Sequence, residues 1–296
     1  MITKKFSGII TALATPFKNG KIDLESLYKI LVKQVNANVD AILLFGTTGE
    51  GISLSLNEKK KIYILTKNTV GNIPIIAGIS SPVTGEAIRL AKVYESWGAD
   101  GIMLITPYYY KTSQIGVLKH FETVALNTSL PIILYNVPVR TNCDILNMNL
   151  FKELEKHDNI VGIKQAGKNL NDCLSLLGKT SLPLFCGSDK FIYKTLIAGY
   201  QGAISVISNV MPKTVKSLYL SIKNNEIMLG KTTFEKLLPV INSLELEPNP
   251  IPLKHALSVI HGCSNELRLP LIVATKNTQN IINNLLNGGE DELFIN

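Results

Sequence analysis

Short apolar runs alternate along the chain with longer segments in which apolar residues recur about every 3.6 positions. This alternation is typical of parallel strands that are buried on both faces and linked by crossover helices. Eight strand and helix pairs that end near residue 225 predict an α/β fold, a (β/α)8 TIM barrel, over residues 1–225. A doubly wound open sheet is the alternative. The candidate strands cover residues 7–14, 41–46, 73–79, 101–106, 131–136, 160–164, 182–187 and 202–207.

The segments between the strands carry helix signals. Residues 23–38 open on Asp23, a residue type favoured at helix N-caps, and their apolar residues fall on one stripe of a helix. Residues 84–97 begin with Thr84, again a capping residue type. Both segments are therefore expected to be amphipathic helices.

Beyond residue 225 the pattern is purely helical. It predicts a C-terminal helical region over residues 226–296, whose end, 288–296, reads as a frayed acidic tail. The helices expected in this region cover residues 226–244, 250–261 and 270–286.

The composition is that of a globular protein, with 46% hydrophobic and 18% charged residues in a chain of 296. The apolar runs are far shorter than the roughly 20 residues that a membrane-spanning helix needs. Residues 1–17 lack the pattern of a signal peptide. We therefore expect a soluble, cytoplasmic chain.

The net charge of +7 makes nucleic acid worth considering as a partner, but the basic residues are dispersed. The one run of three, residues 59–61, lies in a helical pattern and reads as a solvated face, so no nucleic-acid or membrane partner is expected. The cysteines form no CxxC pair and are expected to be reduced thiols. They are Cys143, Cys173, Cys186 and Cys263.

Other common chemistries lack their motifs. The four histidines form neither HExxH nor a group with cysteine, and no GxGxxG or Walker A pattern is present. We expect neither a metal nor a cofactor.

Polar residues gather where the predicted strands end, which is where barrel enzymes place their reactive groups. Lys164 follows an apolar strand, so its amine is expected in the barrel mouth, partly desolvated. Desolvation disfavours the ammonium and leaves a nucleophilic amine, as Schiff-base chemistry requires. The alternative is a lysine that leaves the strand toward solvent.

Three other strand ends offer matching groups. Thr47 and Thr48, between glycines, offer hydroxyls and close backbone N–H groups to a small carboxylate, unless they form a plain turn. Tyr109 and Tyr135 can pass protons through their phenols, with Thr47 as a bridge, although strand-end aromatics are more often core residues. Arg140 follows a proline-stiffened turn and can hold a carboxylate, or else forms an ordinary surface salt bridge.

Four motifs lie at the ends of predicted strands: GTTGE at 46–50, TPYY at 106–109, YNVPVRT at 135–141 and GIK at 162–164. Together they resemble the dihydrodipicolinate synthase family, within the group that includes N-acetylneuraminate lyase and 2-keto-3-deoxygluconate aldolase. Residues 202–206, 249–252 and 267–270 are also similar to this family, so the resemblance covers nearly the whole chain.

The resemblance implies a Schiff base between Lys164 and pyruvate, with Tyr135 as proton donor and acceptor. Thr47 and Tyr109 complete the proton relay, and Tyr109 comes from a neighbouring subunit of a homotetramer. Arg140 receives the carboxylate of L-aspartate 4-semialdehyde. The product, 4-hydroxy-tetrahydrodipicolinate, leads to diaminopimelate and lysine. Because the iminium is the electron sink, no cofactor is implied. The resemblance also implies that pyruvate is held by Thr48, Gly187 and Ile204.

Some positions depart from the family pattern and bear on the second-substrate pocket. Gln165 stands where the family usually has Glu, Asn142 where it has Gly, and Tyr110 where Asn is common. Residues 186–189 read CGSD in place of the more usual SGDD. The alternatives are therefore a related pyruvate-dependent aldolase or lyase, and a catalytically silent barrel used for binding. Arg140 favours the synthase, because the aldolase relatives usually lack it.

Lysine-inhibited members of the family resemble this chain at Glu86 and Tyr108. They typically place Asn where Pro82 stands, and often His where Leu56 stands. Proline lacks a side-chain amide and leucine offers no hydrogen bond. We expect weak or absent inhibition by lysine.

Overall fold

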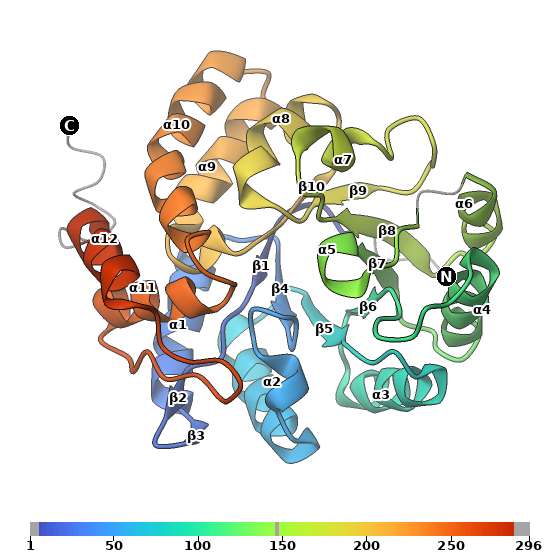
Figure 1. The fold of residues 1–296 in the computed structure, drawn as a ribbon, viewed down its shortest axis with the longest axis horizontal. Coiled ribbons are helices and arrows are strands. Elements are labelled where there is room, and N and C mark those ends of the chain that lie inside the picture. Colours follow the sequence, from blue (N-terminus) through green and yellow to red (C-terminus); the bar gives the residue numbers. More distant parts are fainter. Residues whose placement is uncertain (1–5, 146–147, 287–296) are drawn as a thin grey trace. The chain divides into compact units, whose positions relative to one another are not determined.

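The computed structural model describes residues 6–145 and 148–286. Eight parallel strands form a closed barrel in the hydrogen-bonded order β1-β10-β9-β8-β7-β6-β5-β4 (Figure 1). Closure confirms the predicted barrel and excludes the open sheet. The strands are β1 Gly8–Ala12, β4 Ala41–Leu44, β5 Ile75–Ile79, β6 Gly101–Ile105, β7 Ile132–Asn136, β8 Ile160–Gln165, β9 Leu184–Cys186 and β10 Gly202–Ser205.

Every residue of these eight strands is buried. Burial on both faces explains why the strands appear in the sequence as continuous apolar runs rather than alternating ones. A hairpin of β2 Phe17–Lys18 and β3 Lys21–Ile22 was not predicted, because strands of two residues carry no readable period.

Helices connect and follow the strands. The α-helices before residue 225 are α1 Leu24–Asn36, α2 Leu56–Val70, α3 Thr84–Trp97, α4 Gln114–Ala125, α5 Pro138–Thr141, α6 Met148–Leu154, α7 Leu170–Leu174, α8 Ile192–Ile197 and α9 Pro212–Lys223. Short 3-10 helices are η1 Gly51–Ser53, η2 Asp189–Phe191 and η3 Ile207–Asn209. The C-terminal helices are α10 Ile227–Leu244, α11 Ile251–His261 and α12 Lys276–Leu286.

Of the two predicted caps, one is confirmed and one is wrong. Asp23 caps α1 by accepting a hydrogen bond from the backbone N–H of Ser26 at 3.0 Å. Thr84 lies inside α3, whose N-cap is Val83. Its hydroxyl contacts Nδ1 of His120 at 3.0 Å, so a distant partner satisfies it instead of its own helical turn.

The last helix begins later than predicted, at Lys276 rather than at residue 270. The Glu247 carboxylate accepts hydrogen bonds from the backbone N–H and the hydroxyl of Thr275, both at 2.9 Å. The same hydroxyl accepts from the N–H of Thr278 at 3.4 Å and so caps the helix. The predicted tail, residues 288–296, lies outside the described residues.

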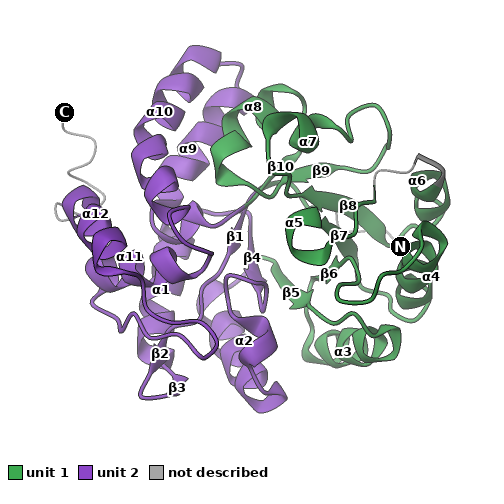
Figure 2. Ribbon diagram, viewed as in Figure 1, with its two compact units in different colours: residues 1–8, 74–204 green, residues 9–73, 205–296 purple. Residues whose placement is uncertain are grey.

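The chain forms two compact units, coloured separately in Figure 2. Unit 1 comprises residues 1–8 and 74–204, and unit 2 comprises residues 9–73 and 205–296. The boundary at residue 225 between a barrel and a helical region stays a prediction.

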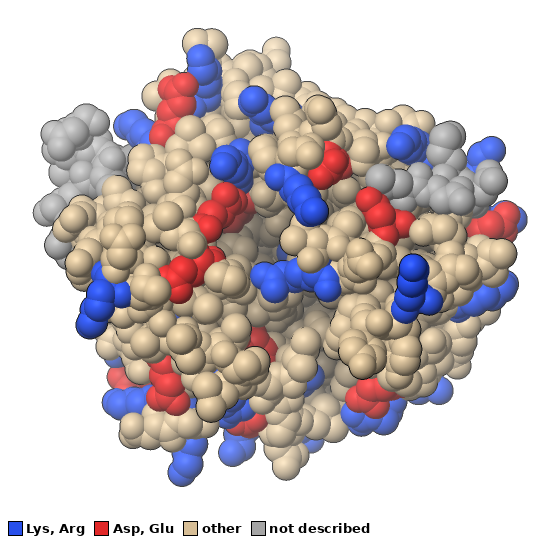
Figure 3. Space-filling model, in the orientation of Figure 1, with Lys and Arg blue, Asp and Glu red and all other residues tan. Residues whose placement is uncertain are grey.

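Within the described part of the chain, no helix has both the length and the apolar character needed to cross a membrane. On the face that Figure 3 shows, Lys and Arg side chains are interspersed with Asp and Glu rather than gathered into a basic stripe. The excess of positive charge is therefore spread over this surface, as the sequence predicts.

Candidate active site

Lys164 and Tyr135 lie side by side in unit 1. The register of the parallel strands β7 and β8 pairs Tyr135 with Lys164, and β9 places Phe185 on the other side of the lysine. Nζ of Lys164 lies 4.4 Å from the centroid of the Tyr135 ring, and both residues are buried. Strand pairing thus brings a buried amine against the ring of a phenol.

Burial also changes the acid–base chemistry of this amine. The pKa of Lys164 is lowered to about 8, chiefly by loss of solvent and in smaller part by the Arg140 guanidinium, while Asp189 and Cys186 act in the opposite direction. The neutral, nucleophilic amine is therefore populated near neutral pH.

This shift predicts the pH dependence of adduct formation at Lys164. Below pH 8 the ammonium predominates, so the rate of imine formation with a carbonyl compound should fall about tenfold for each further pH unit and level off above the pKa. Stopped-flow or quenched borohydride trapping between pH 6 and 10 measures this rate. A rate that keeps rising to pH 10 would indicate an ordinary lysine pKa and contradict the burial argument.

Gly187 makes room for the lysine side chain. A Cβ atom at this position would lie 2.9 Å from Cε of Lys164 and 3.0 Å from the carbonyl oxygen of Gln165. The Gly187 N–H donates to that same carbonyl at 2.8 Å. Ile204 is buried on β10, next to Ala203, which pairs with Cys186 of β9. Gly187 thus lies directly after β9, and Ile204 lies on β10. These are the two strands that follow β8, the strand of Lys164, in the barrel.

Arg140 sits on the one-turn helix α5, which follows β7 directly and leaves the side chain exposed. Asn142 ends this turn at a φ of 51°, and its N–H donates to the carbonyl oxygen of Pro138 at 2.8 Å. Asparagine adopts this left-handed conformation more readily than most residues other than glycine. The departure from glycine at position 142 therefore preserves the turn that carries Arg140.

Tyr109 is not buried beside Tyr135. Its side chain is 92% exposed, and its ring makes an edge contact with Tyr110 at 5.8 Å between centroids. Its backbone has a φ of 72°, which is uncommon for a bulky residue. Strain of this kind is often found at functional sites.

Thr47 and Thr48 follow β4 in unit 2. Thr48 is buried, and its hydroxyl oxygen accepts a hydrogen bond from Nδ2 of Asn249 at 3.0 Å. Because the amide is the donor, the hydroxyl hydrogen of Thr48 is left to point at another acceptor. The loop is tight, since a Cβ at Gly51 would lie 1.9 Å from the carbonyl oxygen of Phe45.

A buried ion pair that no sequence motif predicts holds the loop after β4. Nζ of Lys254 lies 3.0 Å from a carboxylate oxygen of Glu50 and also donates to the carbonyl oxygen of Thr15. The two side chains are 1% and 2% exposed. The Lys254 ammonium and the Arg268 guanidinium both lie over the ring of Phe17, at 4.3 and 4.5 Å from its centroid.

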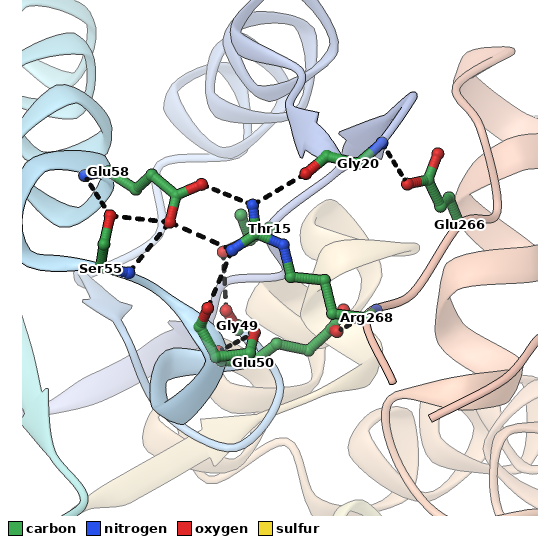
Figure 4. A network of polar contacts seen from close by, with 9 residues as sticks. Thr15, Gly20, Gly49, Glu50, Ser55, Glu58, Glu266 and Arg268 are labelled. Carbon is green, nitrogen blue, oxygen red and sulfur yellow. Dashed lines mark hydrogen bonds and ion pairs between the residues drawn. The ribbon is translucent and has the colours of Figure 1, made fainter. Parts of the chain in front are cut away.

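Arg268 extends this network to the hairpin and to α2, as Figure 4 shows. Its backbone N–H donates to Glu50, and its guanidinium binds Glu58 and the carbonyl oxygen of Gly20. Hydrogen bonding to Arg268 lowers the pKa of Glu58 to about 2. A signal was present in the sequence, because Lys254 is the one Lys, Arg, Asp or Glu residue in the mostly apolar residues 251–261.

Comparison with known proteins identifies a family and individual proteins to which this chain is similar. The model of the dihydrodipicolinate synthetase family matches residues 5–288. A 4-hydroxy-tetrahydrodipicolinate synthase of Rickettsia bellii is 41% identical over 285 residues, which cover 95% of this chain and 96% of the relative. The dihydrodipicolinate synthase of Thermotoga maritima has a solved structure that is 34% identical, with a TM-score of 0.93 over 98% of this chain and 100% of that one.

A further solved structure is the chloride-inhibited dihydrodipicolinate synthase of Acinetobacter baumannii in complex with pyruvate. It is 33% identical, with a TM-score of 0.88, and the match covers 95% of this chain and 97% of that chain.

Proposed function

This chain belongs to the dihydrodipicolinate synthetase family, and we propose that Lys164 carries the family reaction by forming an imine with pyruvate. The activity is that of a 4-hydroxy-tetrahydrodipicolinate synthase, a lyase of the diaminopimelate pathway to lysine. Its substrates are pyruvate and L-aspartate 4-semialdehyde. The observation that carries the proposal is the buried amine of Lys164, with its lowered pKa, beside the ring of Tyr135.

The chemistry follows from a neutral amine in this position. The amine attacks C2 of pyruvate and water leaves, which forms the imine. Loss of a proton from C3 gives an enamine, whose C3 attacks the aldehyde carbon of the second substrate. The amino group of that substrate then attacks C2 and displaces Lys164, so the ring closes and the enzyme is regenerated. The iminium accepts the electron pair when C3 loses its proton and again when the amino group attacks C2, whereas the aldehyde carbonyl accepts it when the carbon–carbon bond forms.

Proton transfers in this scheme need a group close to the imine. We assign them to Tyr135, whose ring lies beside Nζ of Lys164. We assign the relay to Thr47 and Tyr109, and propose that Tyr109 serves a neighbouring subunit of a homotetramer. The 92% exposure of Tyr109 supports this assignment, because a phenol so exposed in one chain is accessible to another. Thr48, Gly187 and Ile204 are proposed to hold pyruvate, and the cytoplasm is the proposed compartment.

Arg140 is proposed to bind the carboxylate of L-aspartate 4-semialdehyde. Arg140→Ala should lower kcat/KM for this substrate by roughly 10- to 100-fold, since a charge-assisted hydrogen bond contributes about 1.5–3 kcal/mol. Imine formation with pyruvate should persist. A coupled assay with both substrates measures the first effect, and borohydride trapping with pyruvate measures the second.

A matched control is Arg89→Ala, which removes an exposed arginine paired with Glu86 on α3 and should leave both readouts unchanged. Unchanged turnover in Arg140→Ala would show that this arginine does not bind the second substrate. A wild-type chain that traps pyruvate but does not turn over aspartate semialdehyde would instead indicate an aldolase. A chain that traps nothing would indicate a silent barrel.

A further inference from the structure

We propose that a largely buried chain of side-chain hydrogen bonds, Gln165–Asn136–Asp144, is a positioning network that holds Arg140 in place for the second substrate. The proposal rests on the proposed function, because it takes Lys164, Tyr135 and Arg140 as the reacting and binding groups. None of the three network residues needs to touch a substrate. Their effect is on where Arg140 stands.

The amide of Asn136 is the centre of the network. Its Nδ2 donates to Oε1 of Gln165 and to Oδ1 of Asp144, both at 2.8 Å. Its Oδ1 accepts from the backbone N–H of Ile145 at 3.4 Å. Nδ2 thus has two acceptors and Oδ1 has one donor, and these bonds determine the orientation of the Asn136 amide.

The network lies behind the reacting pair. Asn136 directly follows Tyr135 and Gln165 directly follows Lys164, and β7 and β8 pair these residues in the same register. Because successive side chains of a strand point to opposite faces, the amides face away from the amine and the phenol. Asn136 and Gln165 are almost completely buried. Nε2 of Gln165 donates to the carbonyl oxygen of Asp172 at 3.0 Å, so each amide group has a partner.

Asn136 also ties together both ends of the turn that carries Arg140. The turn leaves β7 at the residue after Asn136 and returns at Asp144 and Ile145, which both bind the Asn136 side chain. The carbonyl oxygen of Asp144 accepts a further bond from Nε2 of Gln114 at 2.8 Å. Arg140 stands near the middle of this closed loop, so the bond between Asn136 and Asp144 contributes to its position.

Breaking the Asp144 end should therefore move Arg140 without moving Lys164 or Tyr135, which the barrel strands hold. Displacing a binding group by about 1 Å can cost up to 100-fold in rate. A network with only a structural role would lower stability and leave the ratio of the two substrate KM values unchanged. A positioning role changes that ratio.

The test compares Asp144→Ala with Asp144→Asn in the full chain. Asp144→Ala should raise KM for aspartate semialdehyde about tenfold or more. KM for pyruvate and the rate of borohydride-trapped imine formation should stay within about twofold. Asp144→Asn should restore most of the loss, because an amide oxygen still accepts from Nδ2 of Asn136. If Asp144→Ala does not fold, Asp144→Ser replaces it, since a hydroxyl at this position is too short to reach Asn136.

The matched control is Glu95→Ala. The Glu95 carboxylate also ties a turn of unit 1, by accepting from the N–H of Ser129 at 3.1 Å and the hydroxyl of Thr128 at 3.2 Å. It should lower thermal stability and leave both KM values unchanged. An Asp144→Ala variant that raises both KM values equally, or neither, would overturn the network. A wild-type chain inactive on aspartate semialdehyde would overturn the proposed function instead.

Discussion

Replacement of Lys164 by alanine is expected to abolish turnover, lowering kcat by roughly 10⁴- to 10⁶-fold, as loss of a covalent nucleophile does in other enzymes. No other group can take its place, because the imine nitrogen comes from the lysine itself. The variant should also trap no pyruvate with borohydride. A coupled assay and intact-mass spectrometry measure the two effects.

The same replacement should leave the fold intact. Lys164 is buried and its pKa is lowered, so the folded chain gains little from its charge. We expect an unchanged or higher melting temperature, which separates lost chemistry from lost structure. Lys168→Ala is the matched control, because Lys168 is an exposed lysine just after β8 and should keep full activity. Residual turnover within tenfold of wild type in Lys164→Ala would contradict the imine mechanism.

Replacement of Lys254 by methionine is expected to have the largest effect on stability. It removes the positive partner of Glu50 and leaves a carboxylate almost fully buried. Breaking a buried pair in this way costs about 3–5 kcal/mol in the free energy of unfolding. For a chain of this size that corresponds to a fall of roughly 10 °C in melting temperature. Urea unfolding followed by circular dichroism measures the loss.

Two further variants show whether the unpaired charge of Glu50 causes the loss of stability. The double variant Glu50→Gln with Lys254→Met carries no uncompensated charge and should recover much of the stability. Lys29→Met removes an exposed lysine paired with Glu25 and should leave the free energy of unfolding nearly unchanged. If Lys254→Met unfolds at the wild-type denaturant concentration, the ion pair does not stabilise the loop after β4.

The barrel is predictable from the sequence because its strands are buried on both faces and stand out as apolar runs. The hairpin at Phe17–Lys18 and Lys21–Ile22 is not, because each strand has only two residues. The start of α12 depends on a hydrogen bond that the N–H of Thr275 donates to Glu247, 28 positions away. Contacts of this kind leave no local pattern in the chain.

Part of the candidate site can also be predicted from the sequence, and part cannot. Lys164, Tyr135 and Arg140 follow apolar strands, and a polar residue at a strand end is visible in sequence. The residues that hold these side chains in place are not visible in the sequence. Lys254 and Glu50 are separated by 204 positions, and the burial of both is a property of the folded chain. Asn136 meets Asp144 only because the intervening turn closes.

The most direct test of the account is to reduce the wild-type chain with borohydride in the presence of pyruvate and to map the modified peptide by mass spectrometry. We predict one reduced pyruvate per chain, attached to Nζ of Lys164, with loss of synthase activity in proportion to the adduct. An adduct on another lysine, or full activity lost with no adduct on Lys164, would contradict the claim that this buried amine is the nucleophile.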